Sequence, residues 1–206
     1  KRTRQSMRIA SQIGVILAMT LGMSSEALAD EACEQFMDAS VQSALIQFED
    51  RTSDHLKSSL QHFVVDKVDI ARIARFTLGK YSQRQSGANM QRLSIALQGY
   101  FADMLYSSVS ASSGASAEIL GSYDRRPTDC IVETVFHLGD AGDSVLLWRI
   151  FHQGEEYKIY DVALRDRGNT LWLSMELRAQ FASLLGQRNG SIDLVIDNLN
   201  ARTSGP

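Results

Sequence analysis

The sequence has few of the residues from which catalytic and metal sites are built. It contains only two cysteines and four histidines in 206 residues. The two histidines nearest in sequence, His55 and His62, would lie roughly 10 Å apart along a helix, too far to share one ion. We find no serine-nucleophile elbow, zinc-protease motif, phosphate-binding loop or dinucleotide-binding glycine motif. We therefore expect no catalytic residue, no metal ligand and no cofactor.

Proline is also scarce, and no repeat or low-complexity run is present. The chain has two prolines, 44% hydrophobic residues and 22% charged residues. This is an ordinary globular composition, without the bias that is typical of disordered linkers. At this length, a single domain is expected.

No apolar run reaches the roughly 20 residues that a helix needs to cross a bilayer. The short apolar stretch at 9–23 follows a basic segment and precedes Ala27-Leu28-Ala29. This order predicts a secretory signal peptide over residues 1–29, cleaved before Asp30, rather than an uncleaved anchor. Residues 30–203 are then the single mature domain, and 204–206 form a tail.

An excess of positive charge is missing as well. The chain has 21 basic and 24 acidic residues. Cleavage of residues 1–29 would remove four basic residues and one acidic residue, Glu26. The mature chain would then have 17 basic and 23 acidic residues, a net charge of −6. Such a balance argues against a nucleic-acid partner held by phosphate contacts. It also disfavours electrostatic adhesion to anionic lipid surfaces.

The two cysteines allow only one disulfide, between Cys33 and Cys130. Export would favour this bridge, but the spacing of the cysteines does not reveal whether their Cα atoms come within about 7 Å. A pair of free, buried thiols is the alternative.

Apolar periodicity predicts helices first, then strands, then helices again. We expect helices over 31–50, 53–65, 70–78, 86–110, 171–185 and 190–199, and strands over 117–123, 130–138, 144–152 and 157–164. Asp69 is a suitable N-cap for the third helix, and Gly79 suits its C-terminal end. Residues 165–169 are expected to be a polar loop. The fold class is therefore α+β, with a twisted antiparallel four-stranded sheet.

The central feature is a hairpin over 144–164 that turns near Gly154. Its first strand is apolar on both faces, so both faces should be covered. A simple reversal before it would place Glu133 opposite Arg149 as an ion pair. The length of the turn leaves two registers open: one places Ile159 and Asp161 on the Trp148 face, and the other places both with Arg149.

Several segments resemble the MlaC, or toluene-tolerance, family. They are Asp69-Ile70 followed by 76–81, Trp148-Arg149 followed by 157–162, and 177–181 followed by Gly190 and 192–196. The resemblance covers most of the mature chain. It implies a soluble periplasmic carrier that moves phospholipid between the outer and inner membranes, holding the acyl chains in an apolar cavity under an NTF2-like sheet. It also implies two partners, the lipid-binding subunit of an inner-membrane ABC transporter and an outer-membrane lipoprotein–porin complex.

The chain departs from the family pattern at three places. Ser82 and Tyr157 stand where tryptophan is usual, and 167–171 replaces the usual Glu-Gly-x-Ser-Leu. These departures leave open a related hopanoid-associated exported protein. A small-molecule enzyme on a similar cone-shaped sheet, with Asp161 as a general base, is a second alternative. A structural adaptor with a fully packed core is a third.

The expected cavity lies between the apolar sheet face and the apolar stripes of the helices. Its predicted lining residues are Phe76, Leu78, Leu97, Phe101, Leu105, Val132, Phe136, Leu146, Trp148, Ile150, Ile159, Leu171 and Phe181.

Overall fold

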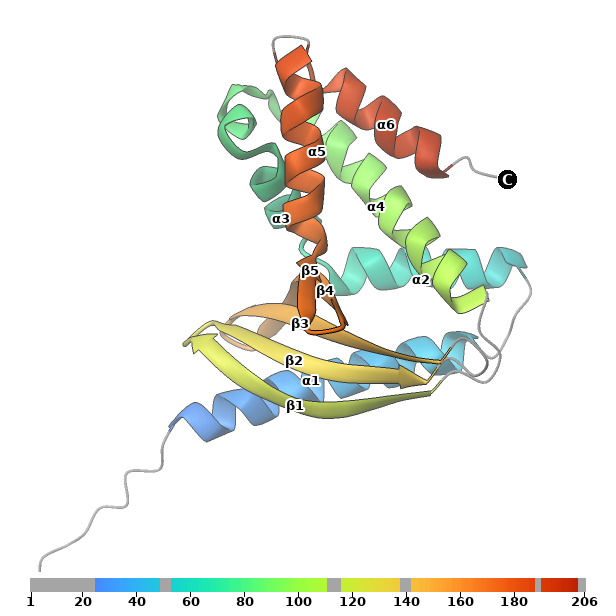
Figure 1. Cartoon of the computed structure of the whole chain (residues 1–206), viewed down its shortest axis with the longest axis vertical. Coiled ribbons are helices and arrows are strands. Elements are labelled where there is room, and N and C mark those ends of the chain that lie inside the picture. Colours follow the sequence, from blue (N-terminus) through green and yellow to red (C-terminus); the bar gives the residue numbers. More distant parts are fainter. Residues whose placement is uncertain (1–24, 49–52, 111–115, 138–141, 188–189, 204–206) are drawn as a thin grey trace, which may run out of the picture.

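The computed structural model describes residues 25–48, 53–110, 116–137, 142–187 and 190–203 (Figure 1). The predicted α+β class is confirmed, but the sheet has five strands rather than four. The predicted signal peptide lies almost wholly outside the described residues, and so does the tail at 204–206. Both remain predictions.

The helices fall near their predicted positions. They are α1 (Ser25–Phe48), α2 (Ser53–Lys67), α3 (Ile70–Leu78), the 3₁₀ helix η1 (Gly79–Arg84), α4 (Gly87–Ser110), α5 (Leu173–Gln187) and α6 (Asp193–Thr203). Asp69 caps α3 as predicted, because its carboxylate accepts the Arg72 N–H at 2.9 Å. Gly79 ends α3 with a positive φ of 55°.

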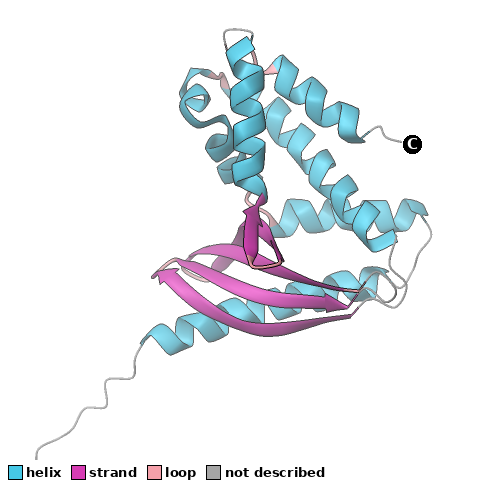
Figure 2. Ribbon diagram, in the orientation of Figure 1, coloured by secondary structure: helices cyan, strands magenta, loops and turns pink. Residues whose placement is uncertain are grey.

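The strands form an antiparallel meander in the order β1-β2-β3-β4-β5 (Figure 2). They are β1 (Ser116–Arg126), β2 (Asp129–His137), β3 (Asp143–Gln153), β4 (Glu156–Asp166) and β5 (Asn169–Trp172). The polar loop predicted at 165–169 is wrong, because β4 continues to Asp166 and pairs with β5. Consequently α5 begins at Leu173, and Leu171 lies in a strand rather than in a helix.

The predicted register between β2 and β3 is shifted by two residues. Glu133 pairs with Leu147, and Arg149 pairs with Ile131. A shift of two keeps every side chain on its predicted face, since the strand period is two. The predicted ion pair is nevertheless lost: Arg149 binds Asp129, and Glu133 binds Arg165.

A β-bulge in β4 gives a register that neither prediction contained. Ile159 pairs with Ile150, on the Trp148 face, whereas Asp161 pairs with Arg149. Tyr160, between them, is the extra residue. One inserted residue reverses the alternation of side chains along the strand, so Ile159 and Asp161 lie on opposite faces of the sheet.

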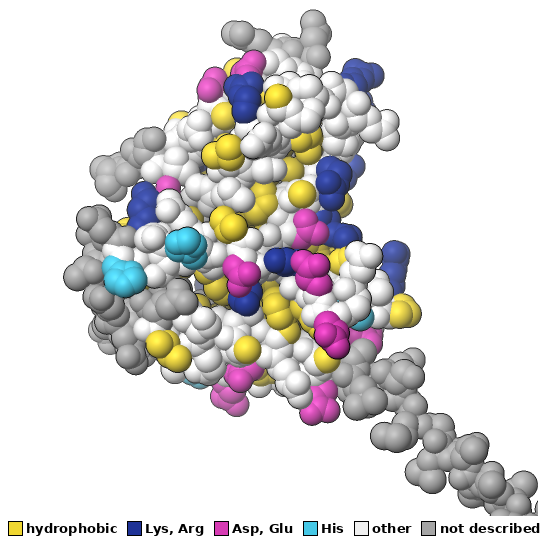
Figure 3. All heavy atoms as spheres, turned by 180° about the vertical axis from the view of Figure 1, so that it is seen from behind, with side chains coloured by type: hydrophobic (Ala, Val, Ile, Leu, Met, Phe, Trp, Pro, Cys, Tyr) yellow, Lys and Arg dark blue, Asp and Glu magenta, His cyan; other side chains and the backbone are white. Residues whose placement is uncertain are grey.

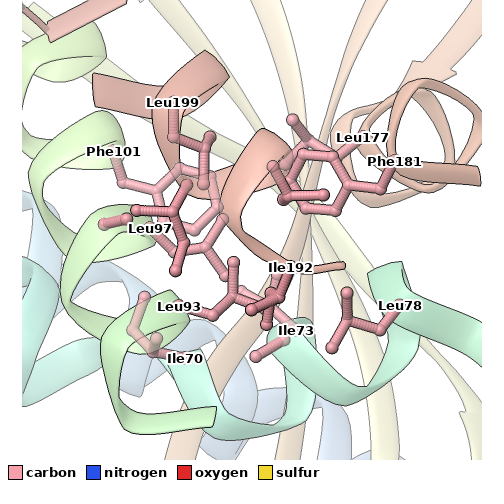
Figure 4. Close-up of a cluster of buried hydrophobic side chains, with 14 of the residues drawn as sticks. Ile70, Ile73, Leu78, Leu93, Leu97, Phe101, Leu177, Phe181, Ile192 and Leu199 are labelled. Atoms are coloured by element: carbon pink, nitrogen blue, oxygen red, sulfur yellow. The ribbon is translucent and has the colours of Figure 1, made fainter. Parts of the chain in front are cut away.

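The molecule has two main hydrophobic cores. One lies among the helices and includes Leu93, Leu97 and Phe181, whose side chains point toward one another in Figure 4. The other joins α1 to the face of the sheet that carries Val132, Trp148 and Ile150. Figure 1 shows α1 running along the sheet and helices α3 to α6 gathered beyond the end at which β4 and β5 rise toward them.

The disulfide between Cys33 and Cys130 is present, with the two Cα atoms 6.7 Å apart. Of the two alternatives, the bridge is therefore confirmed. Both cysteines are fully buried in the core between α1 and the sheet. The bond fixes α1 to β2, across 97 residues of sequence.

Candidate functional site

An apolar cavity lies where the sheet meets the helices. The sheet contributes Trp148, Ile159 and Val162, beside Asp161. The helices contribute the remaining walls: Phe63 and Val64 from α2, Ile73 from α3, Phe101, Met104 and Leu105 from α4, and Leu173 and Ser174 from α5, with Val68 between α2 and α3. The cavity therefore borders both main cores.

The cavity has a volume of about 50 Å³. Pockets that hold a small ligand usually measure roughly 300–1,000 Å³. Its walls would have to move apart before an acyl chain could enter. Most of the walls belong to one or the other of the two main cores, and Phe63 and Val68 pack against both.

Trp148 is fixed in the cavity wall by a polar contact. Its indole N–H donates to the Thr134 hydroxyl at 2.9 Å, and Thr134 is fully buried. A buried indole N–H without a partner would be costly, so this bond allows the ring to present its apolar body to the cavity. On the same face, Phe136 packs at a tilt with its ring centroid 6.3 Å from that of Trp148.

Asp161 is a buried polar residue at the edge of the cavity. It accepts hydrogen bonds from the backbone N–H groups of Ser174 and Val162, each at 3.0 Å, and from the Ser174 hydroxyl. Burial raises the pKa of Asp161 above its usual value, although these bonds oppose the rise. Ser174 is the second residue of α5, so Asp161 satisfies an N–H group at the start of this helix and ties α5 to β4.

The opposite face of the sheet carries a polar and aromatic cluster. Arg149 binds Asp129 through two hydrogen bonds of 3.0 and 2.6 Å, and the Tyr160 hydroxyl donates to the same carboxylate at 2.9 Å. Burial alone would raise the pKa of Asp129, but these partners hold it below its usual value. The Arg72 guanidinium of α3 lies 3.7 Å from the centroid of the Phe151 ring. This cluster joins α3 to the sheet.

The predicted cavity residues fall into four groups. Phe101, Leu105, Trp148 and Ile159 line the cavity. The other predicted residues of the sheet face pack in the core beneath α1; they are Val132, Phe136, Leu146 and Ile150. The third group, Leu78, Leu97 and Phe181, lies in the helical core. Phe76 and Leu171 are exposed on the surface.

Most of the wall that comes from α2, α3 and α5 was not predicted from the sequence, and neither was Met104 of α4. Phe63, Val64 and Met104 lie on periodic helical stripes, but such stripes are equally typical of an ordinary core. Leu173 was likewise predicted to face inward from its helix, whereas Val68 stands between two helices and gave no periodic signal. Val68 is placed by a parallel bridge to Ile159, which no local pattern could indicate.

Among the described residues, the one cluster with metal-ligand chemistry is Cys33, Asp124 and Cys130. Its two sulfur atoms are bonded to each other, and a disulfide is not the thiolate that a metal needs. Across all the residues that the structure describes, no helix is both long enough and apolar enough to cross a bilayer.

Comparison with known proteins extends these observations. The profile of the MlaC protein family matches residues 19–201. A solved structure described as the phospholipid-binding protein from Ralstonia solanacearum in complex with a phospholipid is similar, with a TM-score of 0.66 and 16% sequence identity. The match covers 85% of this chain and 97% of that one, and at this identity it supports the fold alone. No curated protein matches significantly. Since the family profile covers nearly the whole described chain, the protein belongs to the MlaC family.

Proposed function

We propose that this protein is a periplasmic carrier that holds the acyl chains of a phospholipid in the cavity between its sheet and its helices. In this role it moves lipid between the outer and inner membranes. The observation that carries the proposal is the apolar cavity lined by Phe101, Leu105, Trp148 and Ile159, placed where the two main cores meet. The phospholipid in the similar Ralstonia protein supports it further.

Apolar burial supplies enough free energy for such a carrier. Each buried methylene contributes about 0.8 kcal/mol, so two acyl chains can be held tightly without any catalytic group. The cavity would have to widen from about 50 Å³. Opening would separate the helical walls from Trp148 and Val162, and the lipid would replace the contacts that are lost.

The contacts of Asp161 favour a carrier over an enzyme. A general base needs a lone pair that is directed at a substrate. The Asp161 carboxylate instead accepts three hydrogen bonds from Ser174 and Val162, which position α5. These contacts support a structural role for Asp161.

The proposed partners are the lipid-binding subunit of an inner-membrane ABC transporter and an outer-membrane lipoprotein–porin complex. Membership of the MlaC family supports both, because a carrier must receive lipid at one membrane and deliver it at the other. The ligand is tested first by purifying the protein from periplasm and extracting its lipids for mass spectrometry. A stoichiometric phospholipid is expected. A hopanoid, or no lipid, would contradict the assignment.

The position of the cavity is tested by charge substitution. Leu105→Glu should leave a folded protein that has lost its lipid, because the half-buried Leu105 lines the cavity. Ile150→Glu should unfold the protein, since Ile150 is fully buried beside α1 and a buried unpaired charge costs several kcal/mol. The readouts are circular dichroism and the amount of lipid that co-purifies.

Ile95→Glu is the matched control, because Ile95 lies on the same helix and is 61% exposed. It should keep both fold and lipid. Leu105→Trp adds an apolar test, since the larger ring should fill the cavity and displace the lipid. A folded Leu105→Glu or Leu105→Trp protein that keeps its lipid would show that the cavity is not the site.

A further inference from the structure

Charge is segregated between the two parts of the molecule. Residues 70–110 contain five basic residues and one acidic residue, Asp103, a net charge of +4. Residues 30–69 and 111–172, which include α1, α2 and the sheet, contain nine basic and nineteen acidic residues, a net charge of −10. The negative total therefore hides a positive region on α3, η1 and α4.

Two of the five basic residues in this region have acidic partners. Arg72 pairs with Asp69 at 3.0 Å, and Arg92 pairs with Asp193 at 2.8 Å. Arg75, Lys80 and Arg84 are exposed and form no ion pair within the described ranges. In Figure 3, dark-blue side chains follow the upper right edge, where α3 and η1 lie in this view.

An aromatic ring and a fourth cation adjoin these three. Phe76 is 38% exposed. Arg178 of α5 lies with its guanidinium carbon 4.9 Å from the centroid of the Phe76 ring and donates to the Phe76 carbonyl at 3.1 Å. We call Arg75, Phe76, Lys80, Arg84 and Arg178 the basic face.

A groove of about 350 Å³ opens beside Arg75, between α3, η1 and the first turns of α4. Arg75, Gln83 and Gln91 bring a guanidinium and two amides to it, and Ser82 and Ser94 bring two hydroxyls. None of the described residues that line it is acidic. The guanidinium can hold two oxygens of one phosphate, and the amides of Gln83 and Gln91 can donate to the others. The Ser82 and Ser94 hydroxyls donate to the backbone carbonyls of Gly79 and Met90, so they contribute polarity to the groove rather than further donors.

We propose that the basic face docks on an anionic bilayer, with the phosphate of one lipid headgroup in this groove. The acidic residues of the sheet do not prevent docking, because at physiological salt a charge is screened beyond about 8 Å. An apolar ring surrounded by cations, such as Phe76, can enter the boundary between the headgroups and the acyl chains while the cations bind the headgroups. A bilayer is favoured over an acidic protein because the groove offers donors for a phosphate and the basic face also carries an apolar ring, that of Phe76.

The test is co-sedimentation of the full chain with vesicles of 30% phosphatidylglycerol in phosphatidylcholine, and with vesicles of phosphatidylcholine alone. Binding is expected only to the anionic vesicles, and it should weaken between 50 and 300 mM salt. Arg75→Gln/Arg84→Gln should lower the partition coefficient roughly 25-fold, since each basic residue near an anionic surface contributes roughly fivefold. Arg126→Gln/Arg167→Gln, an equal loss of exposed charge at the sheet, should leave it unchanged.

Three results would overturn the proposal. They are equal binding to both kinds of vesicle, equal loss in both double variants, and binding of polyglutamate in place of anionic vesicles, which would indicate an acidic protein partner. Inorganic phosphate at millimolar concentration should not release the protein from the vesicles, because it can fill the groove but cannot replace the contacts of the other basic residues with the anionic bilayer. The basic-face variant should keep its co-purified lipid, so this experiment and the test of the carrier role fail independently.

Discussion

Asp129 and Asp161 are both buried carboxylates of the sheet, yet their surroundings move their pKa values in opposite directions. Asp161 accepts hydrogen bonds but forms no ion pair with any described residue, and burial raises its pKa although these bonds and the charge of Arg149 oppose the rise. Asp129 is also buried, but its two bonds to Arg149 and one to Tyr160 outweigh burial and lower its pKa. At the scale of one residue, a close guanidinium decides which carboxylate stabilises the fold as an anion.

The two aspartates should therefore affect stability with opposite dependence on pH. The folded-state pKa of Asp161 is raised, so its contribution is complete below the unfolded value of 3.8 and is lost as the pH rises through the folded value. Asp161→Asn should equal or exceed the wild type in stability at pH 7, with a difference that shrinks below pH 4. Urea unfolding between pH 3 and pH 8 measures this.

Asp129→Asn is the comparison variant. The contribution of Asp129 is present above pH 3.8 and is lost as the pH falls through its lowered folded-state value. The substitution should cost about 2 kcal/mol at pH 7, because it removes charge-assisted bonds to Arg149. A loss of stability in Asp161→Asn that equals the loss in Asp129→Asn at pH 7 would contradict this account.

At the scale of elements, the β4–β5 hairpin sets where α5 begins. Its turn consists of Arg167 and Gly168, with φ values of 47° and 84°. Two positive φ values in a two-residue loop give the turn that matches the twist of an antiparallel pair. The hairpin carries the chain back beside Ala163, so that Ser174 meets Asp161 and Leu173 meets the cavity.

Gly168→Ala should destabilise the protein by about 1 kcal/mol, because alanine disfavours the left-handed region. Gly99→Ala should do the opposite. Gly99 lies within α4, nothing stands within 4 Å of an added Cβ, and alanine stabilises a helix by roughly 0.5–1 kcal/mol relative to glycine. Thermal unfolding compares both variants with the wild type. Changes of the same sign would show that backbone conformation is not the cause.

At the scale of the whole molecule, two cores meet at the cavity and one disulfide secures the sheet core. The bridge joins α1 to β2 and closes a loop of 97 residues. Without it, α1 would be held on the sheet by Met37, Val41 and their neighbours alone. A disulfide that closes a loop of this length stabilises the protein mainly by reducing the conformational entropy of the unfolded state.

Cys33→Ala/Cys130→Ala should therefore lower the free energy of unfolding by about 2–5 kcal/mol. Guanidinium unfolding of the double variant measures the loss, and wild type in reducing agent should reproduce it. The helical core is built from other elements, so a cavity variant such as Leu105→Trp should still displace lipid in the double variant. An unchanged unfolding midpoint would mean that the bridge adds nothing to the packing of α1.

Local features of the sequence determined the positions of most elements. Asp69 and Gly79 fixed the ends of α3, because capping depends on residues only a few positions away. The alternation of apolar residues placed Val132, Trp148 and Ile150 on one face of the sheet, and that assignment survived a two-residue error in register. Helical spacing likewise placed Phe101 and Leu105 on one apolar stripe of α4, and both line the cavity with Trp148.

Tertiary structure decided everything that depends on pairing between distant segments. It selected Asp129 as the partner of Arg149, resolved the register of β4 through the bulge at Tyr160, and placed Phe181 in the core rather than at the cavity. Periodicity shows that a side chain faces inward, but not which of two cores it enters. That choice rests on the packing of whole helices against one another and against the sheet, a balance of many contacts that no single stretch of sequence contains.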